Sequence, residues 1–185
     1  MSRKRVAIDI DGVMADFCGG FTEVAVSLGI IPHGWKTSQQ VKWDFDFPVH
    51  KVWEELSGNR MNWWMRLMPL VNDEEIDIIN DLIRNHDVFF VTNRTPVRGL
   101  ASNDQTRLWL EGIGLRTERV FVTDDKAYVC KLFNIEYVLE DKPANLQAIE
   151  EAGIPHVYAR RWDYNKQWEP YVENLVEFCE IVDKG

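Results

Sequence analysis

Two acidic residues, Asp9 and Asp11, stand at the end of the apolar run RVAIDI, and a third, Asp16, follows a bend that contains Gly12. Carboxylates crowded at the end of a buried strand repel one another and lose hydration, so their ionised forms cost free energy. Mg²⁺ offsets that cost, because it binds one or two carboxylates and keeps its other positions for water and substrate phosphate. This pattern therefore favours a Mg²⁺ site that handles phosphate.

The spacing of the first two acids suits a two-step phosphate hydrolysis. A phosphate held beside Asp9 would allow its carboxylate to attack phosphorus and form an aspartyl-phosphate, which splits one difficult step into two easier ones. Asp11, two residues further on, can protonate the leaving oxygen and then activate water. We expect Asp16 to make local hydrogen bonds instead of binding the metal.

The elements that must position these acids alternate between short apolar strands and amphipathic helices. Asn72 and Asp73 can cap a helix whose isoleucines repeat at helical spacing. This alternation predicts an α/β fold, a Rossmann-like three-layer α/β/α core around a parallel sheet. The expected strands are 5–10, 87–92, 119–123, 137–140 and 155–159, and further helices are expected at 98–113, 125–134, 143–152 and 169–183.

One segment interrupts the alternation. Residues 18–68 are dense in Trp, Phe and Met and are broken at Pro32, Gly34 and Pro48. We interpret them as a small helical cap inserted after the first strand, with residues 1–17 and 69–185 forming the core.

Ligands of open α/β sheets bind outside the carboxyl ends of the strands. Besides Asp9 and Asp11, three other strands deliver polar clusters to this edge. These are Thr92-Asn93-Arg94, Thr123-Asp124-Asp125-Lys126 and Glu140-Asp141-Lys142.

Composition narrows the class of protein. The 185 residues carry a net charge of -9, which argues against a stable complex with nucleic acid, because phosphate neutralisation needs a basic face. No apolar stretch approaches the length of a membrane span and no secretory signal is visible, so we expect a cytoplasmic protein. The sequence leaves a homodimer open. Three widely spaced cysteines are expected to be reduced core residues: Cys18, Cys130 and Cys179.

Four motifs in order resemble those of the haloacid-dehalogenase-like phosphatase superfamily. They are DIDGV at 9–13, the Thr that ends the second strand, a Lys before the fourth strand, and the acidic pair ED at its end. The resemblance spans the core from Val6 to about Pro143. More narrowly, DIDGVMADF, the cap that follows it, VFFVTNR, TDDKAYV and VLEDKP are similar to the 5'(3')-deoxyribonucleotidase-like branch, including its bacterial and phage members.

The resemblance implies a role for each motif residue. Asp9 would be the nucleophile and a Mg²⁺ ligand, and Asp11 the acid/base, with its main-chain carbonyl on the metal. Asp141 would be the metal ligand from the fourth strand, with Glu140 behind it. Three further residues would serve the transferring phosphate: Thr92 and Asn93 by binding it, and Lys126 by neutralising charge between it and Asp9.

This chain departs from the family pattern at two positions, since Asn93 replaces a hydroxyl residue and Glu140 replaces an Asp. By themselves, Asp124 and Asp125 are more typical of helix caps than of ligands.

The aromatic residues of the cap fall into two groups. Phe17, Trp43 and Phe45 are candidates for a lid on which a flat base stacks. Trp53, Trp63 and Trp64 are interpreted as the packing core of the cap. Four arginines lie in segments that follow strands feeding this edge: Arg94, Arg98, Arg160 and Arg161. Their default interpretation is surface charge, which we prefer for Arg98 and Arg161, although one arginine of the stretch YARRWDYN could face the phosphate entrance.

The expected function is that of a Mg²⁺-dependent phosphomonoesterase that hydrolyses deoxyribonucleoside or ribonucleoside monophosphates. Its expected partner is thus a small phosphorylated substrate. Two alternatives stay open: a phosphatase for another small metabolite such as a sugar phosphate, and a non-catalytic binding protein on the same fold. The acidic balance and the cap disfavour a phosphatase for nucleic-acid ends.

Overall fold

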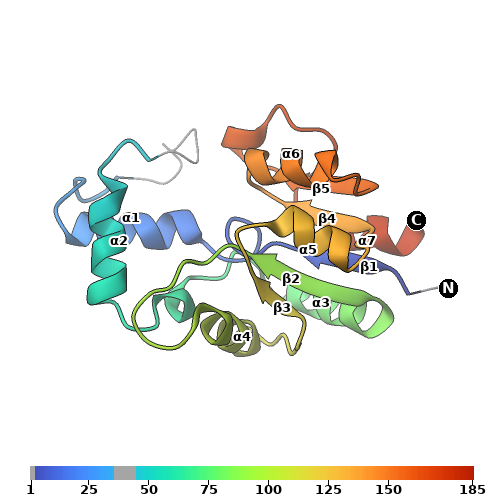
Figure 1. Cartoon of the computed structure of the whole chain (residues 1–185), viewed down its shortest axis with the longest axis horizontal. Coiled ribbons are helices and arrows are strands. Elements are labelled where there is room, and N and C mark those ends of the chain that lie inside the picture. The colour runs from blue at the N-terminus through green and yellow to red at the C-terminus, as the bar shows by residue number, and fades with distance from the viewer. Residues whose placement is uncertain (1–2, 36–44) are drawn as a thin grey trace.

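A computed structural model describes residues 3–35 and 45–185 (Figure 1). Trp43 lies outside the described residues. The described chain contains one six-stranded parallel sheet in the order β3-β2-β1-β4-β5-β6. The strands are β1 (Arg5–Ile8), β2 (Asp87–Thr92), β3 (Val120–Val122), β4 (Tyr137–Glu140), β5 (His156–Arg160) and β6 (Tyr171–Val172).

Helices cover both faces of this sheet, as the predicted three-layer fold requires. Val6 and Ile8 on β1 join a core with α3 (Asp73–Asn85), α4 (Ser102–Gly112) and α7 (Leu175–Lys184). Ala7 faces the opposite side, because successive side chains of a strand alternate, and joins a core with α5 (Lys126–Leu132) and α6 (Pro143–Glu151). The predicted α/β class and parallel sheet are therefore confirmed.

The predicted helix starts can be checked against the hydrogen bonds at each N-terminus. Asn72 and Glu75 form a reciprocal capping box at α3, which confirms the predicted start. Asp16 accepts a hydrogen bond from the amide of Gly19 and caps α1 (Phe17–Ser27), in line with its expected local role. Asp125 caps α5 in the same way through the amide of Tyr128.

Two helices begin later in the chain than predicted. The predicted helix 169–183 is instead the short strand β6 followed by α7, because the side chain of Asn174 caps a helix that begins at Leu175. The predicted helix 98–113 begins only at Ser102, since Gly99 has a φ of 118° that no right-handed helix accommodates.

The inserted segment contains α1, α2 (Val49–Gly58) and the 3-10 turn η2 (Trp63–Arg66). In Figure 1, α1 and α2 project from the end of the sheet where β1 and β2 terminate. The two chain crossings into and out of this segment are paired: Asp16 donates its amide to the carbonyl of Met68 at 2.8 Å, and Leu70 donates to Met14 at 2.7 Å.

The turn η2 packs against the core helix α4. Trp64 Nε1 donates to the carbonyl of Thr95 at 3.0 Å, and Trp109 Nε1 donates to the carbonyl of Leu67 at 2.8 Å. Within the described part of the chain, no helix combines the length and apolar composition that crossing a bilayer demands. The thiols of Cys18, Cys130 and Cys179 are free, as expected, although Cys18 is only half-buried.

Candidate active site

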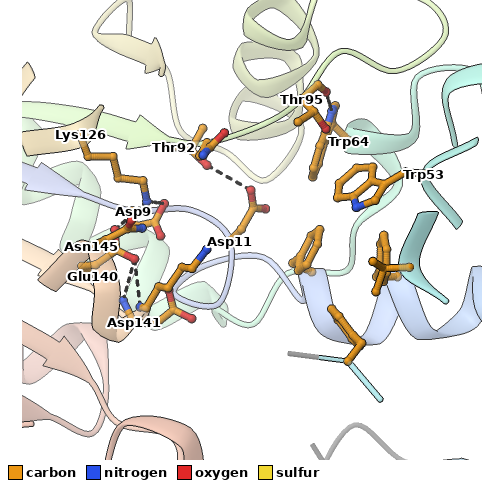
Figure 2. A pocket seen from close by; sticks show the side chains of 16 residues that line it. Asp9, Asp11, Trp53, Trp64, Thr92, Thr95, Lys126, Glu140, Asp141 and Asn145 are labelled. Atoms are coloured by element: carbon orange, nitrogen blue, oxygen red, sulfur yellow. Dashed lines mark hydrogen bonds and ion pairs between the residues drawn. The ribbon is translucent and has the colours of Figure 1, made fainter. Parts of the chain in front are cut away.

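A cavity of about 380 Å³ opens where the carboxyl ends of the central strands meet the cap. It brings together residues that the sequence scatters over 137 positions, from Asp9 to Asn145. Figure 2 shows Asp9, Glu140, Asp141 and Lys126 on one side of this cavity, Trp53 and Trp64 on the other, and the Asp11 side chain between the two groups. The predicted site residues that line it are Asp9, Asp11, Phe17, Phe45, Thr92, Asn93, Lys126 and Asp141.

Lys126 lies between two buried carboxylates. Its Nζ is 2.8 Å from Asp9 Oδ1 and 2.6 Å from Glu140 Oε2, and the lysine is only 6% exposed. Burial alone would lower the pKa of Lys126, but the adjacent carboxylates of Asp9 and Glu140 raise this pKa above its ordinary value. The ammonium group therefore stays charged and neutralises the site where Asp9 would attack.

The carboxyl groups of Asp9 and Glu140 differ in how well they are satisfied. Glu140 Oε1 accepts the amides of Asp141 and Lys142 at 3.2 and 3.0 Å, while Oε2 accepts from Lys126. Burial opposes ionisation of Glu140, but Lys126 and these hydrogen bonds lower its pKa. Burial and the neighbouring Glu140 raise the pKa of Asp9 well above its ordinary value. Of these two carboxyl groups, Asp9 is thus the one whose ionised form a further cation would stabilise more.

Asp141 has one oxygen without a partner. Its Oδ2 accepts the hydroxyl of Tyr164, whereas Oδ1 is buried and has no hydrogen-bond donor among the described residues. Burial, Glu140 and Asp9 together raise the pKa of Asp141 well above its ordinary value. A buried carboxylate oxygen without a donor costs free energy unless a cation meets it.

The three acids at these strand ends fit a divalent metal. One carboxylate oxygen each from Asp9, Glu140 and Asp141 lies within 4.8 Å of the others, and all three residues are buried. Gly12 makes room for this arrangement, because a Cβ at its position would stand 2.0 Å from Asp141 Oδ2. Hard oxygen donors such as these suit a divalent cation like Mg²⁺, which binds one or two carboxylates and keeps its other positions for water and phosphate.

The Asp11 side chain faces a different set of partners. Arg94 donates to it twice, from Nε at 3.0 Å and from Nη2 at 2.8 Å, and Thr92 Oγ1 donates to Asp11 Oδ2 at 3.1 Å. Its carboxylate is therefore not part of the three-acid cluster. A metal contact by Asp11 was expected through its main-chain carbonyl, and this contact stays a prediction.

Arg94 is a site residue that the sequence reasoning missed. Its default interpretation was surface charge, yet it is only 2% exposed and its guanidinium lies 5.0 Å from the ring centroid of Trp64 and 5.6 Å from that of Trp109. The sequence feature that could have identified Arg94 as a site residue was its position two residues after Thr92, at the edge of the sheet where the site lies.

The other three arginines do not line this cavity. Arg98 is exposed and donates to the carbonyl of Gly58 at 3.0 Å, in line with a surface role. Arg161 lines a second cavity, of about 480 Å³, and is paired loosely with Glu169 at 3.7 Å. Arg160 lies 5.7 Å from the ring centroid of Trp162, with its Nε and Nη1 buried. In this structure neither Arg160 nor Arg161 faces the acids.

Aromatic rings form the cap side of the cavity. Phe17 and Phe45 line it as expected, and so do Trp53 and Trp64, which we had interpreted as packing residues only. Phe17 stacks on Trp53 and Trp64 with centroid distances of 6.2 and 6.0 Å. Trp63 is buried and does not line the cavity, which agrees with its expected packing role.

Two polar residues line the cavity without having been predicted, Thr95 and Asn145, and so does Lys142, which the sequence had placed in the polar cluster after the fourth strand. Lys142 and Asn145 flank the start of α6, directly after the acidic pair. Pro143 indicates a helix start directly after Asp141, because proline is favoured in the first turn of a helix. This feature of the sequence could have placed Lys142 and Asn145 beside the site.

Comparison with known proteins supports the fold. No family model and no curated protein matches the chain. Among solved structures, a hydrolase from Pseudomonas syringae has a TM-score of 0.62 at 11% identity, covering 99% of both chains. The HAD-hydrolase YfnB from Bacillus subtilis, bound to magnesium, has a TM-score of 0.58 at 15% identity, covering 98% of this chain and all of that one.

A third similar structure is described as a β-phosphoglucomutase from Thermotoga maritima, with a TM-score of 0.57 at 15% identity, covering 98% of this chain and 99% of that chain. At these identities the likeness concerns the fold. The chain therefore has the fold of haloacid-dehalogenase-like hydrolases.

Proposed function

We propose that the protein is a Mg²⁺-dependent phosphomonoesterase that acts through an aspartyl-phosphate on Asp9, and that its substrates are nucleoside monophosphates, as in the 5'(3')-deoxyribonucleotidase-like branch. One observation carries the proposal: a buried cluster of three acids and a lysine shares a single cavity with an aromatic wall. The acids and the lysine suit a metal-bound phosphate, and the aromatic wall suits a flat base.

Asp9 and Asp141 are the residues of this cluster that would bind the metal directly, with Asp141 offering its unpartnered Oδ1. When bound, Mg²⁺ would supply charge neutralisation and orient the phosphate. Because the protein amides and Lys126 already satisfy Glu140, we assign it the role of supporting Asp9 and Asp141 from behind.

The nucleophile is Asp9, whose Oδ1 is fixed by Lys126 and by the amide of Ile10 at 2.6 Å. These two donors hold Oδ1 in place, which leaves Oδ2 as the oxygen for attack on phosphorus. The attack forms the bond between Oδ2 and phosphorus and breaks the bond to the ester oxygen. Lys126 then offsets the negative charge that the transferring phosphate brings.

Asp11 is the acid/base of the proposed reaction. As the acid, once it has left Arg94 and taken up a proton from solvent, it gives that proton to the departing ester oxygen. As the base it takes a proton from the water that hydrolyses the aspartyl-phosphate, which restores its protonated form for the next acid step. Arg94 and Thr92 occupy its oxygens in this structure, so the carboxylate must turn from Arg94 toward the substrate for the acid step. Thr92 and Asn93 line the cavity beside it and would bind the phosphate.

The substrate class rests on the aromatic wall. Trp53 is half-buried and lines the cavity opposite the acids, packed against the buried rings of Phe17 and Trp64. Stacking of a base on such a ring is worth about 1–3 kcal/mol. A sugar phosphate offers these rings no aromatic face, although the C–H face of its ring can pack on them, so the substrate panel compares both classes. The cavity of about 380 Å³ falls within the range of small-molecule sites.

Phosphate release from a panel of substrates tests the proposal. The panel holds deoxyribonucleoside and ribonucleoside 5'- and 3'-monophosphates, sugar phosphates and p-nitrophenyl phosphate, each assayed with Mg²⁺ and with EDTA. We expect release only with Mg²⁺ and a higher kcat/KM for nucleotides than for sugar phosphates. A higher kcat/KM for sugar phosphates would contradict the proposed substrate class and favour a sugar phosphatase. If the wild type releases phosphate from no substrate, a non-catalytic binding protein is favoured.

A further inference from the structure

The segment after β5 contacts two of the strand ends that carry the proposed site. We call residues 162–165, which comprise Trp162 and the 3-10 turn η3 (Asp163–Asn165), the brace turn. Trp162 Nε1 donates to the carbonyl of Gly12 at 2.7 Å, in the loop after β1. The Tyr164 hydroxyl and the Asn165 amide group both donate to Asp141, after β4.

The brace turn is itself held rigidly by Asn165, which is fully buried. Its Nδ2 donates to the carbonyls of Asp141 and Arg160, at 2.8 and 2.7 Å. Its Oδ1 accepts the amide of Trp162 at 2.7 Å. A buried amide with both donors and its acceptor engaged cannot shift without leaving polar groups unpaired, so the turn has a fixed position against β4.

The two carboxylate oxygens of Asp141 have different surroundings. Oδ2 is enclosed by the Tyr164 hydroxyl and by Gly12, where there is no room even for a Cβ. Oδ1 is buried without a donor among the described residues and belongs to the carboxylate that joins Asp9 and Glu140 in the acidic cluster. One oxygen is thus fixed by the brace turn while the other is left for a cation.

We propose that Tyr164 is a positioning residue for the metal site: its hydroxyl fixes Asp141 Oδ2, so that Oδ1 is directed at the cation. Residues that hold metal ligands in orientation contribute strongly to metal affinity, and their loss typically weakens it about 10- to 100-fold. The inference rests on the metal site of the proposed function but is independent of the substrate.

Removal of the Tyr164 hydroxyl tests the role directly. Mg²⁺ and Mn²⁺ are titrated calorimetrically into the wild type and into Tyr164→Phe, and the dissociation constants are compared. We expect metal binding to Tyr164→Phe to weaken by about 10- to 100-fold. The matched control is Tyr171→Phe on β6, which loses the same hydroxyl from a half-exposed ring that contacts Arg161. Its metal affinity should equal that of the wild type.

Kinetics supply a second readout. In Tyr164→Phe the Mg²⁺ concentration for half-maximal activity should rise by a similar factor, while kcat at saturating Mg²⁺ returns toward the wild-type value. A lower kcat that no Mg²⁺ concentration restores would contradict a role in metal positioning, and so would an unchanged dissociation constant.

Loss of folded protein does not obscure the result, because calorimetric stoichiometry counts the competent fraction. Trp162→Phe gives an independent check, since it keeps an aromatic ring but loses the hydrogen bond to Gly12; we expect it to weaken metal binding less than Tyr164→Phe does. Equal weakening by Tyr171→Phe would overturn the inference. If the wild type binds neither ion, the proposed metal site itself fails, which is a different result from equal binding by wild type and variant.

Discussion

Arg94 and Asp11 form a buried two-point ion pair, in which Nε and Nη2 of the arginine lie 3.0 and 2.8 Å from the two carboxylate oxygens. The arginine also contacts Trp64, which lines the cavity from the cap side. Asp11 therefore has a structural duty in addition to its proposed chemical one. Asp9, only two residues away, shares Lys126 with a second carboxylate, that of Glu140.

This contrast predicts opposite effects of two similar substitutions on stability. Asp11→Asn leaves a guanidinium buried without its counter-charge, so we expect the free energy of unfolding to fall by about 3 kcal/mol. Asp9→Asn removes a carboxylate whose burial beside Glu140 is unfavourable, and Lys126 keeps Glu140 as its partner. We expect Asp9→Asn to be as stable as the wild type or more so. Urea unfolding without metal measures both, and equal losses would contradict the contrast.

The proposed roles of Asp9 and Asp11 also predict how the same two variants change the rate of phosphate release. Asp9→Asn should abolish phosphate release although it is folded, because an amide is a poor nucleophile. Asp11→Asn should lower turnover by about 10²- to 10⁴-fold, the usual contribution of a general acid/base. Phosphate release by Asp9→Asn close to the wild-type rate would remove Asp9 from its proposed role.

The base-stacking wall gives a test that separates recognition from chemistry. We expect Trp53→Ala to lower kcat/KM for nucleoside monophosphates by about 1–3 kcal/mol, roughly five- to 150-fold, because one stacking surface is lost. Hydrolysis of p-nitrophenyl phosphate should change much less. Trp35→Ala is the matched control, since Trp35 packs edge-on against Phe47 in the cap and does not line the cavity. Equal loss on both substrates would make Trp53 a purely structural residue.

Much of the fold and the convergence of the site could be predicted from the sequence, because both follow from local patterns. Strand ends in a parallel sheet meet at one edge, so Asp9, Thr92, Lys126 and Asp141 had to lie close together. The two-residue strand β6 carries too little pattern to be distinguished from the start of a helix.

The contacts of single side chains could not be predicted in this way. That Arg94 is buried depends on Trp64 and Trp109, which come from segments 30 residues before it and 15 after it. Tyr164 reaches Asp141 only because the turn after β5 folds back over β4. Such contacts are set by tertiary packing, which one sequence does not display.

Gly12 gives a test with a control at the same backbone geometry. Gly12 and Gly29 have φ values of 86° and 67°, so alanine at either position costs about 1–3 kcal/mol of backbone strain. Only at Gly12 does the added Cβ meet Asp141, whereas nothing lies within 4 Å at Gly29. Calorimetric titration with Mg²⁺ should show binding by Gly29→Ala and a loss of at least tenfold for Gly12→Ala. Normal binding by Gly12→Ala would place the metal away from Asp141.

A pH-dependent contribution to stability is expected at the start of β2. A hydrogen bond from Arg119 at 2.7 Å, and one from Arg3, lower the pKa of Asp87. A carboxyl whose pKa is lower in the folded state stabilises the protein above its unfolded-state pKa of about 3.9 and loses this effect as the pH falls through its folded-state pKa.

The ion pair of Asp87 with Arg119 is partly exposed, so we expect Asp87→Asn to lower the free energy of unfolding by less than about 1 kcal/mol at pH 7. Urea unfolding at a series of pH values checks the sign: the difference from the wild type should shrink as the pH falls below 4. It should also shrink in 1 M NaCl, which screens exposed charges. A difference that grows with acidity would mean that Asp87 acts through packing.

The paired crossings beside Ala15 and Pro69 make the insertion a side branch of an otherwise continuous scaffold. Since its two ends already lie next to each other, the branch closes a loop whose entropic cost changes only slowly with its length. A change in the length or sequence of this branch would therefore alter the cap side of the cavity, and with it the proposed substrate preference, without changing the register of the sheet. The turn η2 limits such changes, because Trp64 donates hydrogen bonds to Gln105 on α4 and to the carbonyl of Thr95 in the segment that precedes α4. The replaceable stretch therefore ends before η2.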